Sequence, residues 1–289
     1  MSKETAIFSV ISFNIADGLS TNIPELQHVL WREKEKRPKV LFMSYPEAFK
    51  PGMVDKKTVN RFSRYFGHEG FVITPYKTAD KRPDDHVLLT TYDATALEHR
   101  ISSTRVRLAT RNATKFDVKH PRVGGKLTAI FGHLDDRSEA SRVMQARALM
   151  GIIKPEDKTI LGFDFNAMYE TSAGAQITRF IGHALAGMRP ESTDPNPVTG
   201  KRSRTAQLFA LSDMAIGTTM TELSESGFKD ADESRYPGGT LKIAPGPFGI
   251  GIDKLLHNAG ITVIDVGTFR GPSDHRGIVA TFEVDQVAA

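Results

Sequence analysis

The sequence contains no cysteine, which excludes disulfide bonds, thiolate metal ligands and cysteine nucleophiles. It has no apolar run near the roughly 18 residues that a membrane-spanning helix needs. Its start shows no charged segment followed by a long apolar one, so we expect no secretory signal. The formal net charge is only +4, so charge alone does not indicate nucleic-acid binding. We therefore expect a cytoplasmic protein without a membrane span, and we expect it to be a monomer.

Strand-like and helix-like segments alternate along the chain. The composition, 39% hydrophobic and 25% charged, is typical of a globular protein, and we predict a single domain over residues 1–289. Strands are predicted at Ala6–Asn14, Lys39–Met43, Gly70–Pro75, His86–Thr91, Arg105–Ala109, Lys126–His133, Thr159–Asn166, Ile252–Leu256, Ile261–Val266 and Gly277–Val284. Helices are predicted at Ile23–Arg32, at Ser138–Ile153 and around Ile177–Met188, and a long surface loop at Pro190–Arg204.

This pattern favours an α/β (α+β) fold. Short turns such as 257–260 join some of the strands, which argues against a fully parallel sheet. Two sheets packed face to face, with helices outside, would bury the apolar residues.

Polar side chains stand at the ends of several predicted strands. Asp164 and Asn166 lie two positions apart at a strand end, so both point to the same face. A carboxylate and an amide placed this way can position a water molecule or a phosphate oxygen. The alternative is an ordinary turn, in which Asp and Asn are common.

Asn14 and Glu47 also follow apolar strands, and Pro46 ends any ladder before Glu47. A single carboxylate at a strand end can hold Mg²⁺, which prefers oxygen ligands and often uses only one or two carboxylates. The alternative for Glu47 is a charge at the N-terminus of a helix.

Asp274 and His275 are adjacent at a loop-to-strand junction and suit metal ligation and proton transfer. Asp253 lies inside an apolar run, and a buried carboxylate needs a partner. We predict that this partner is His275, whose imidazole the carboxylate would orient and make more basic. The alternative is an edge-strand Asp253 in water. His133 ends another strand and could donate to a phosphoryl oxygen, or have only a structural role.

The order of these residues along the chain resembles the endonuclease/exonuclease/phosphatase (DNase I-like) superfamily. The resemblance extends from Ser12-Phe13-Asn14 to Ser273-Asp274-His275. Between them, Arg142-x-x-Gln145 is similar to the family's Arg/Gln helix, and residues 223–231 are similar to a helix-to-strand passage of the family.

The resemblance implies a four-layer α/β sandwich with two central mixed sheets. It implies a metal-dependent phosphoric ester hydrolase that uses Mg²⁺ or Mn²⁺. The ion would be held by Glu47, with help from Asn14 and Asp274.

The resemblance also implies the catalytic groups. His275, paired with Asp253, would act as the general base or stabilise the transition state. The attacking water and the phosphate would be oriented by Asp164 and Asn166. His133 would contact a phosphoryl oxygen.

The sequence departs from the family pattern at several positions. Phe163 separates Gly162 from Asp164, and Pro46 stands where Gln is usual. Phe13 stands where Trp is common, and Gly277 where Pro is usual. None of these changes removes a chemical group from the site, so we expect activity in a divergent branch of the family.

Basic residues suggest a nucleic-acid substrate. Between residues 99 and 122, one acid, Asp117, accompanies Arg100, Arg105, Arg107, Arg111, Lys115, Lys119 and Arg122. The candidates for gripping a phosphate backbone are Arg105, Arg107, Lys201 and Arg202. The alternative is a solvated basic face. The single tryptophan, Trp31, is expected on a packed helix and so is not a candidate for stacking on bases.

Three functions are compatible with the sequence. The first is a Mg²⁺-dependent phosphodiesterase acting on DNA or RNA. The second is a phosphatase or phosphodiesterase for a small-molecule or lipid phosphate. The third is a non-catalytic binding module on the same fold, against which the retained polar residues argue.

Overall fold

The computed structural model describes residues 5–16, 18–37, 39–49, 54–76, 86–93, 100–109, 111–119, 126–136, 138–168, 217–232, 241–242 and 249–284. The predicted helix around Ile177–Met188 and the predicted loop Pro190–Arg204 lie outside these residues, and so do the candidates Lys201 and Arg202.

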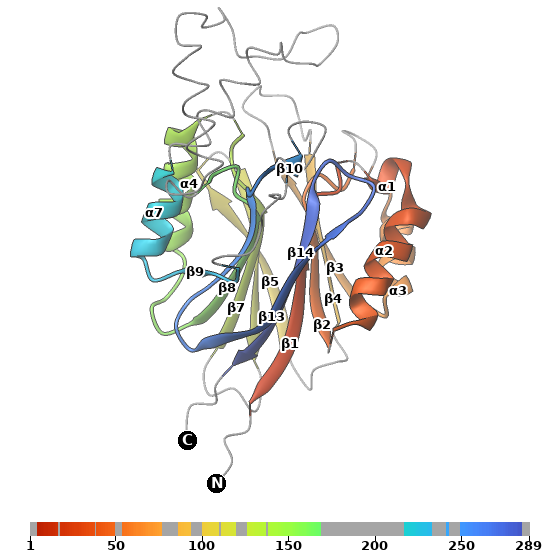
Figure 1. Ribbon diagram of the computed structural model, residues 1–289, viewed down its shortest axis with the longest axis horizontal. Helices are drawn as coiled ribbons and strands as arrows, with labels where there is room; N and C mark the ends of the chain where they lie inside the picture. Colours follow the sequence, from red (N-terminus) through yellow and green to blue (C-terminus); the bar gives the residue numbers. More distant parts are fainter. Residues whose placement is uncertain are drawn as a thin grey trace, which may run out of the picture.

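Two six-stranded sheets form the centre of the molecule (Figure 1). The first sheet has the order β13-β14-β1-β2-β4-β3, and the second has the order β5-β6-β7-β8-β12-β9. Strands of the first sheet are β1 (Ala6–Ser12), β2 (Val40–Tyr45), β3 (Gly70–Tyr76), β4 (His86–Tyr92), β13 (Ile261–Arg270) and β14 (Arg276–Val284). Strands of the second sheet are β5 (Arg100–Leu108), β6 (Arg111–Lys119), β7 (Lys126–His133), β8 (Lys158–Asp164), β9 (Lys229–Asp230) and β12 (Asp253–His257). A separate short pair is formed by β10 (Leu241–Lys242) and β11 (Gly249–Ile250).

Both sheets are mixed. The central pairs β1–β2 and β7–β8 are parallel, and the strands beside them pair antiparallel. Because sequence-adjacent parallel strands need a crossover, a helix follows β1 and another follows β7.

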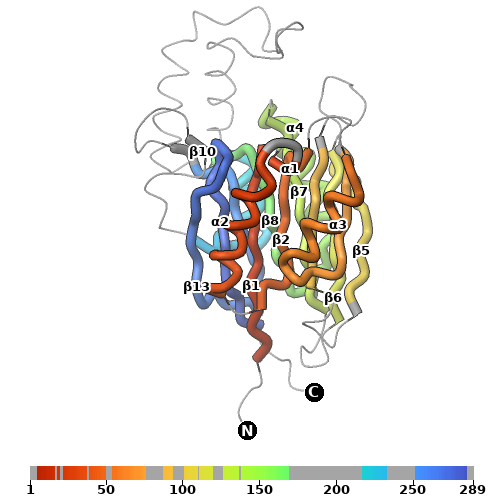
Figure 2. The backbone as a smooth tube through the Cα atoms, turned by 90° about the vertical axis from the view of Figure 1, so that its right-hand side faces the viewer, coloured from red at the N-terminus to blue at the C-terminus, as the bar shows by residue number. Residues whose placement is uncertain are grey.

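The helices cover the outer faces of the two sheets. Helices α1 (Gly18–Thr21), α2 (Ile23–Glu35) and α3 (Lys56–Tyr65) flank the first sheet, as Figures 1 and 2 show, and α4 (Glu139–Met150) and α7 (Thr218–Glu225) flank the second. Three apolar clusters fill the spaces between the four layers. Between the sheets, the ring of Phe42 lies 5.0 Å from that of Phe116 and 5.4 Å from that of Phe131, measured between centroids. The predicted four-layer sandwich is confirmed. Among the described helices, none is long and apolar enough to cross a membrane.

Several elements were not predicted from the sequence, among them β6 and α3. Strand β6 carries Arg111 and Lys115 among its apolar residues, which hides its alternation, yet Arg111 is only 2% exposed. Helix α3 buries Val59, Phe62 and Ser63 on one face, and its N-cap Asp55 accepts hydrogen bonds from two backbone N–H groups of the first turn.

Trp31 lies on the packed helix α2, as predicted, although its own side chain is 38% exposed. Helix α2 buries the stripe of Leu26, Leu30 and Glu33, and Trp31 lies about 100° around the helix from Leu30. Its ring packs edge-to-face on Tyr65 of α3, with 5.6 Å between the ring centroids.

The strand register brings distant parts of the sequence to one end of the sandwich. His133, at the end of β7, lies opposite Asp164 of the parallel strand β8. Asp164 in turn lies opposite Asp253, where the antiparallel strand β12 begins. In the other sheet, β1 and β2 end at the same level, shortly before Asn14 and Glu47.

Candidate active site

Asp164 lies at the centre of the polar cluster at this end of the sandwich and is 1% exposed. Its Oδ2 accepts a hydrogen bond from Nδ2 of Asn14 at 3.0 Å, and its Oδ1 accepts one from the backbone N–H of Asn166 at 3.1 Å. The same Oδ2 lies 3.5 Å from Nε2 of His133 and 3.9 Å from Nδ1 of His275. One buried carboxylate is therefore shared between two amides and faces two imidazoles.

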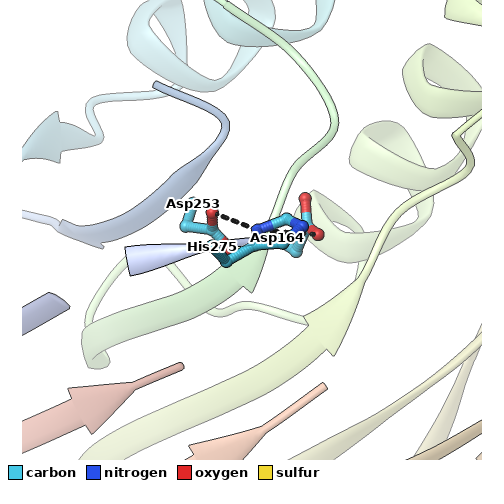
Figure 3. A group of neighbouring side chains, drawn as sticks. All are labelled: Asp164, Asp253 and His275. Atoms are coloured by element: carbon cyan, nitrogen blue, oxygen red, sulfur yellow. Dashed lines mark hydrogen bonds and ion pairs between the residues drawn. The ribbon is translucent and has the colours of Figure 1, made fainter. Parts of the chain in front are cut away.

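His275 and Asp253 form a buried pair (Figure 3). Nδ1 of His275 lies 2.7 Å from Oδ2 of Asp253, which is the contact expected from the sequence. Burial lowers the pKa of His275, but the carboxylates of Asp253, Asp164 and Asp274 outweigh it and raise the pKa to about 10.

His133 is oriented by Asn166. Nδ2 of Asn166 donates to the carbonyl oxygen of Leu134 at 3.0 Å, which identifies that atom as the amide nitrogen. The same nitrogen lies 2.7 Å from Nε2 of His133, which must therefore accept. The proton of the neutral imidazole is then on Nδ1, the atom that lies 3.7 Å from Oε1 of Glu47.

Two residues of the site have a left-handed backbone conformation, Glu47 with a φ of 52° and Asn166 with a φ of 50°. Asparagine adopts this region readily, whereas for Glu47 it is strained. Such strain is commonly found at functional sites, where the surrounding structure imposes it. Both residues follow the end of a buried strand, and both side chains lie beside His133.

The candidate metal ligands surround the cluster at different depths. Asn14 is buried, and its Oδ1 accepts a hydrogen bond from the N–H of Ala16 at 3.1 Å, so its amide nitrogen faces Asp164. The side chain of Glu47 is 26% exposed. Asp274 is exposed, and its Oδ1 lies 3.4 Å from the hydroxyl of Ser273.

These residues fit a hard divalent cation. Ligand atoms of Asp164, Asp253 and His275 lie within 4.8 Å of one another, but the imidazole nitrogen is already bonded to Asp253. The suitable oxygens belong to the carboxylates of Glu47, Asp164 and Asp274 and to the amide of Asn14, whose oxygen has a second lone pair besides the one that Ala16 uses. Carboxylate and amide oxygens are the ligands that Mg²⁺, Mn²⁺ and Ca²⁺ prefer.

The structure does not bring every candidate to the cluster. Arg105 and Arg107 are exposed on the edge strand β5. They lie on the side of the second sheet that faces the first sheet, because Arg105 pairs with Thr114, whose hydroxyl bonds to that of Thr74 in β3. Arg107 lies near the end of β5 where the chain turns into β6, since Leu108 pairs with Arg111. This turn is at the same end of the sheet as the polar cluster. Arg111 was counted with the basic face, and this is wrong because its guanidinium is buried and bonded to Asp136 at 2.9 Å.

Ser273 belongs to the predicted Ser273-Asp274-His275 motif, but the sequence indicated no role for it. Its hydroxyl donates to the carbonyl of Asn14 at 2.8 Å and accepts from the N–H of His275 at 3.1 Å. Ser273 thus connects the turn after β1, which carries Asn14, to the turn before β14, which carries His275. A serine directly before Asp-His was the signal available in the sequence.

Solved structures with this fold were found over nearly the whole chain. An endonuclease/exonuclease/phosphatase family protein from Bacteroides thetaiotaomicron has a TM-score of 0.61 and 14% identity, covering 98% of this chain and 99% of that one. D. rerio TDP2, complexed with a single-strand DNA product, has a TM-score of 0.58 and 15% identity, covering 96% and 99%. The inositol polyphosphate 5-phosphatase domain of SPsynaptojanin, with inositol (1,4)-bisphosphate and calcium, has a TM-score of 0.56 and 14% identity, covering 99% and 86%. Neither a family sequence model nor a characterised protein matches the sequence significantly. The chain therefore has the fold of the endonuclease/exonuclease/phosphatase proteins, as the resemblance in its sequence predicted.

Proposed function

We propose that this protein is a Mg²⁺- or Mn²⁺-dependent phosphodiesterase that cleaves nucleic acid. The observation that carries the proposal is the buried cluster at the strand ends, in which Asp164 faces both His133 and the Asp253–His275 pair. Carboxylates, imidazoles and amides at this spacing supply the donors and acceptors that phosphoryl transfer needs. The likeness in fold to a protein with bound DNA product supports the substrate class.

The ion would be held by Glu47 and Asp274, with the amide of Asn14 completing the oxygen ligands. When bound, it would neutralise charge on the phosphate and stabilise the leaving oxygen.

The protein's own groups bind and orient the other reactants. Asp253 fixes the imidazole of His275, which in its neutral form takes a proton from water and in its charged form stabilises the phosphorane-like transition state. Nδ1 of His133 donates to a phosphoryl oxygen, since Asn166 occupies its Nε2. Asp164 accepts a hydrogen bond from the attacking water.

The nucleic-acid backbone would extend from this cluster across the edge strand β5. Arg105 and Arg107 are exposed there and project from the same face of the strand. Each would neutralise one phosphate, which gives affinity without sequence preference. Lys201 and Arg202 stay candidates for the same role. We propose that the protein acts as a monomer.

A second candidate function is a phosphatase for a small-molecule or lipid phosphate. The specific support is the likeness in fold to the inositol polyphosphate 5-phosphatase domain and to a mannosyl-6-phosphatase from Bacteroides thetaiotaomicron. The net charge of only +4 is also compatible with a small substrate.

Hydrolysis of supercoiled plasmid DNA and of bis-p-nitrophenyl phosphate, in Mg²⁺, Mn²⁺ or EDTA, tests the proposal. We expect metal-dependent nicking that His275→Ala and Glu47→Ala each lower by about 100-fold or more while the fold is retained. Near wild-type activity in both variants would refute the site. Cleavage of the small diester alone would favour the second function, and no turnover of either substrate would leave a phosphomonoesterase or a binding module.

A further inference from the structure

Three consecutive carbonyl groups begin at the last residue of β7, and each accepts a hydrogen bond from a different buried side chain. The carbonyl of His133 accepts from Nη1 of Arg111 at 3.4 Å. The carbonyl of Leu134 accepts from Nδ2 of Asn166 at 3.0 Å. The carbonyl of Asp135 accepts from Nη1 of Arg142 at 3.0 Å. The turn that carries His133 is thus held from β6, from the end of β8 and from α4.

The N–H groups of the same turn are also fixed. That of Leu134 donates to the carbonyl of Asp164 at 2.9 Å, which continues the β7–β8 ladder. That of Asp135 donates to Oε1 of Gln145 at 2.8 Å. Gln145 and Arg142 therefore hold Asp135 on its two sides, the N–H and the carbonyl, and together they form a clamp on the turn.

Holding the turn with buried polar side chains requires that these side chains lose their contacts with water, which is unfavourable. Arg142 and Gln145 are both 0% exposed, and Arg142 is among the largest fully buried side chains of the residues that the structure describes. Removing a guanidinium from water carries a desolvation penalty, and a buried ion pair such as the one with Glu139, at 2.8 Å, is weak evidence for added stability. A surface turn could satisfy the same backbone groups with water instead. The buried groups therefore indicate a requirement for a fixed position rather than for stability.

The ion pair extends this arrangement to a second helix. Oε1 of Glu139 accepts a hydrogen bond at 2.6 Å from the N–H of Thr219, in the first turn of α7. The turn after β7, helix α4 and the start of α7 are thereby connected through one buried polar network.

We propose that Arg142 and Gln145 are positioning residues that hold the turn 133–135 and thereby aim Nδ1 of His133 at the substrate. The proposal rests on the role given to His133 under the proposed function. A catalytic group that is displaced by about 1 Å can lose up to about 100-fold in rate. Removing the clamp should therefore lower kcat more than it raises KM.

The test compares Gln145→Met, which removes the acceptor, with Gln145→Glu, which keeps an oxygen at that place. Leu149→Ala, in the apolar part of the same helix, is the control for lost stability. We expect Gln145→Met to lower kcat for bis-p-nitrophenyl phosphate about 10-fold or more, Gln145→Glu to recover most of it, and Leu149→Ala to lower only the melting temperature. In a His133→Ala background, Gln145→Met should have no further effect. A full additional loss there would overturn the proposal.

A second readout does not depend on turnover. The ¹⁵N resonances of His133, assigned with His133→Ala, should show one Nδ1–H tautomer in the wild type and a mixture in Gln145→Met. A single tautomer and unchanged kcat in the variant would overturn the clamp while leaving the proposed function intact. The expected tautomer change in an enzyme without any hydrolysis would instead support the clamp and refute the function. If Gln145→Met does not fold, Arg142→Lys tests the same turn from its carbonyl side, with the same outcomes.

Discussion

Among the carboxylates around His275, Asp253 contributes most to its raised pKa. It is 2% exposed, and its carboxylate bonds to Nδ1 of His275 at 2.7 Å. Asp253→Asn keeps the size and removes the charge, so the imidazole loses the carboxylate that raises its pKa and makes it more basic. We expect turnover of bis-p-nitrophenyl phosphate to fall about 100-fold. The matched control is Asp265→Asn, a half-exposed carboxylate on β13, which should leave turnover unchanged. Equal rates for the two variants would remove Asp253 from the mechanism.

His68 gives the fold a sensitivity to acid. It is buried between Thr91, 2.8 Å from Nδ1, and the carbonyl of Val40, 3.1 Å from Nε2. Burial, helped by the charge of Lys34, lowers its pKa to about 4. The unfolded chain, with a His pKa of about 6.5, binds this proton first, so the contribution of His68 is complete above pH 6.5 and is lost as pH falls toward 4.

The expected loss from this single group is about 3 kcal/mol of unfolding free energy at pH 4. His68→Gln keeps hydrogen-bonding groups and cannot titrate. Urea unfolding of both proteins at pH 7, 5.5 and 4.5 should therefore show the wild type losing more stability than the variant as pH falls. A difference that does not change with pH would show that His68 does not titrate in this range.

At the scale of the elements, the connection between α2 and β2 contains avoidable strain. Lys39 has a φ of 41°, its side chain is exposed, and its carbonyl accepts from the N–H of Ser9. Lys39→Gly relieves the left-handed strain, which costs about 1–2 kcal/mol, at the expense of more freedom in the unfolded chain. We expect a net gain of up to about 1 kcal/mol in the free energy of unfolding. Lys39→Ala removes the same side chain but keeps the Cβ, so chemical denaturation should separate the two variants. An equal effect of both would rule out backbone strain as the cause.

The strands also show which parts of the fold could be predicted from the sequence and which could not. Strands β1, β2, β7 and β8 were predicted because they are buried on nearly every residue and so form apolar runs. Strand β6 was not, since a charged side chain such as Arg111 can be buried by partners that lie elsewhere in the sequence. The Asp253–His275 contact could be anticipated because a carboxylate in an apolar run needs a partner. The bond from Asn14 to Asp164 could not, since nothing local to either residue encodes a contact between two different sheets.

At the scale of the whole molecule, the net charge of only +4 means that the proposed nucleic-acid binding would depend on local charge. Arg105→Ala combined with Arg107→Ala should weaken binding to DNA and reduce the slope of log K against log salt by about 0.9 for each phosphate that is no longer neutralised. The control is Arg61→Ala combined with Arg64→Ala, two exposed arginines on α3, on the outer face of the other sheet. Fluorescence anisotropy at several salt concentrations measures both. Identical slopes would show that the β5 face is only solvated.

Strand β1 has its neighbour β14 at the far end of the sequence, with Ala6 opposite Val284 and Ser12 opposite Ile278. During synthesis one edge of β1 can pair with β2 early, but its other edge stays unpaired until β14 has left the ribosome. Until then Asn14 and His275 cannot come together, and the growing chain lacks a complete site. A nascent chain therefore carries most residues of the cluster without their assembled geometry, and the cluster is completed only after β14 has been synthesised.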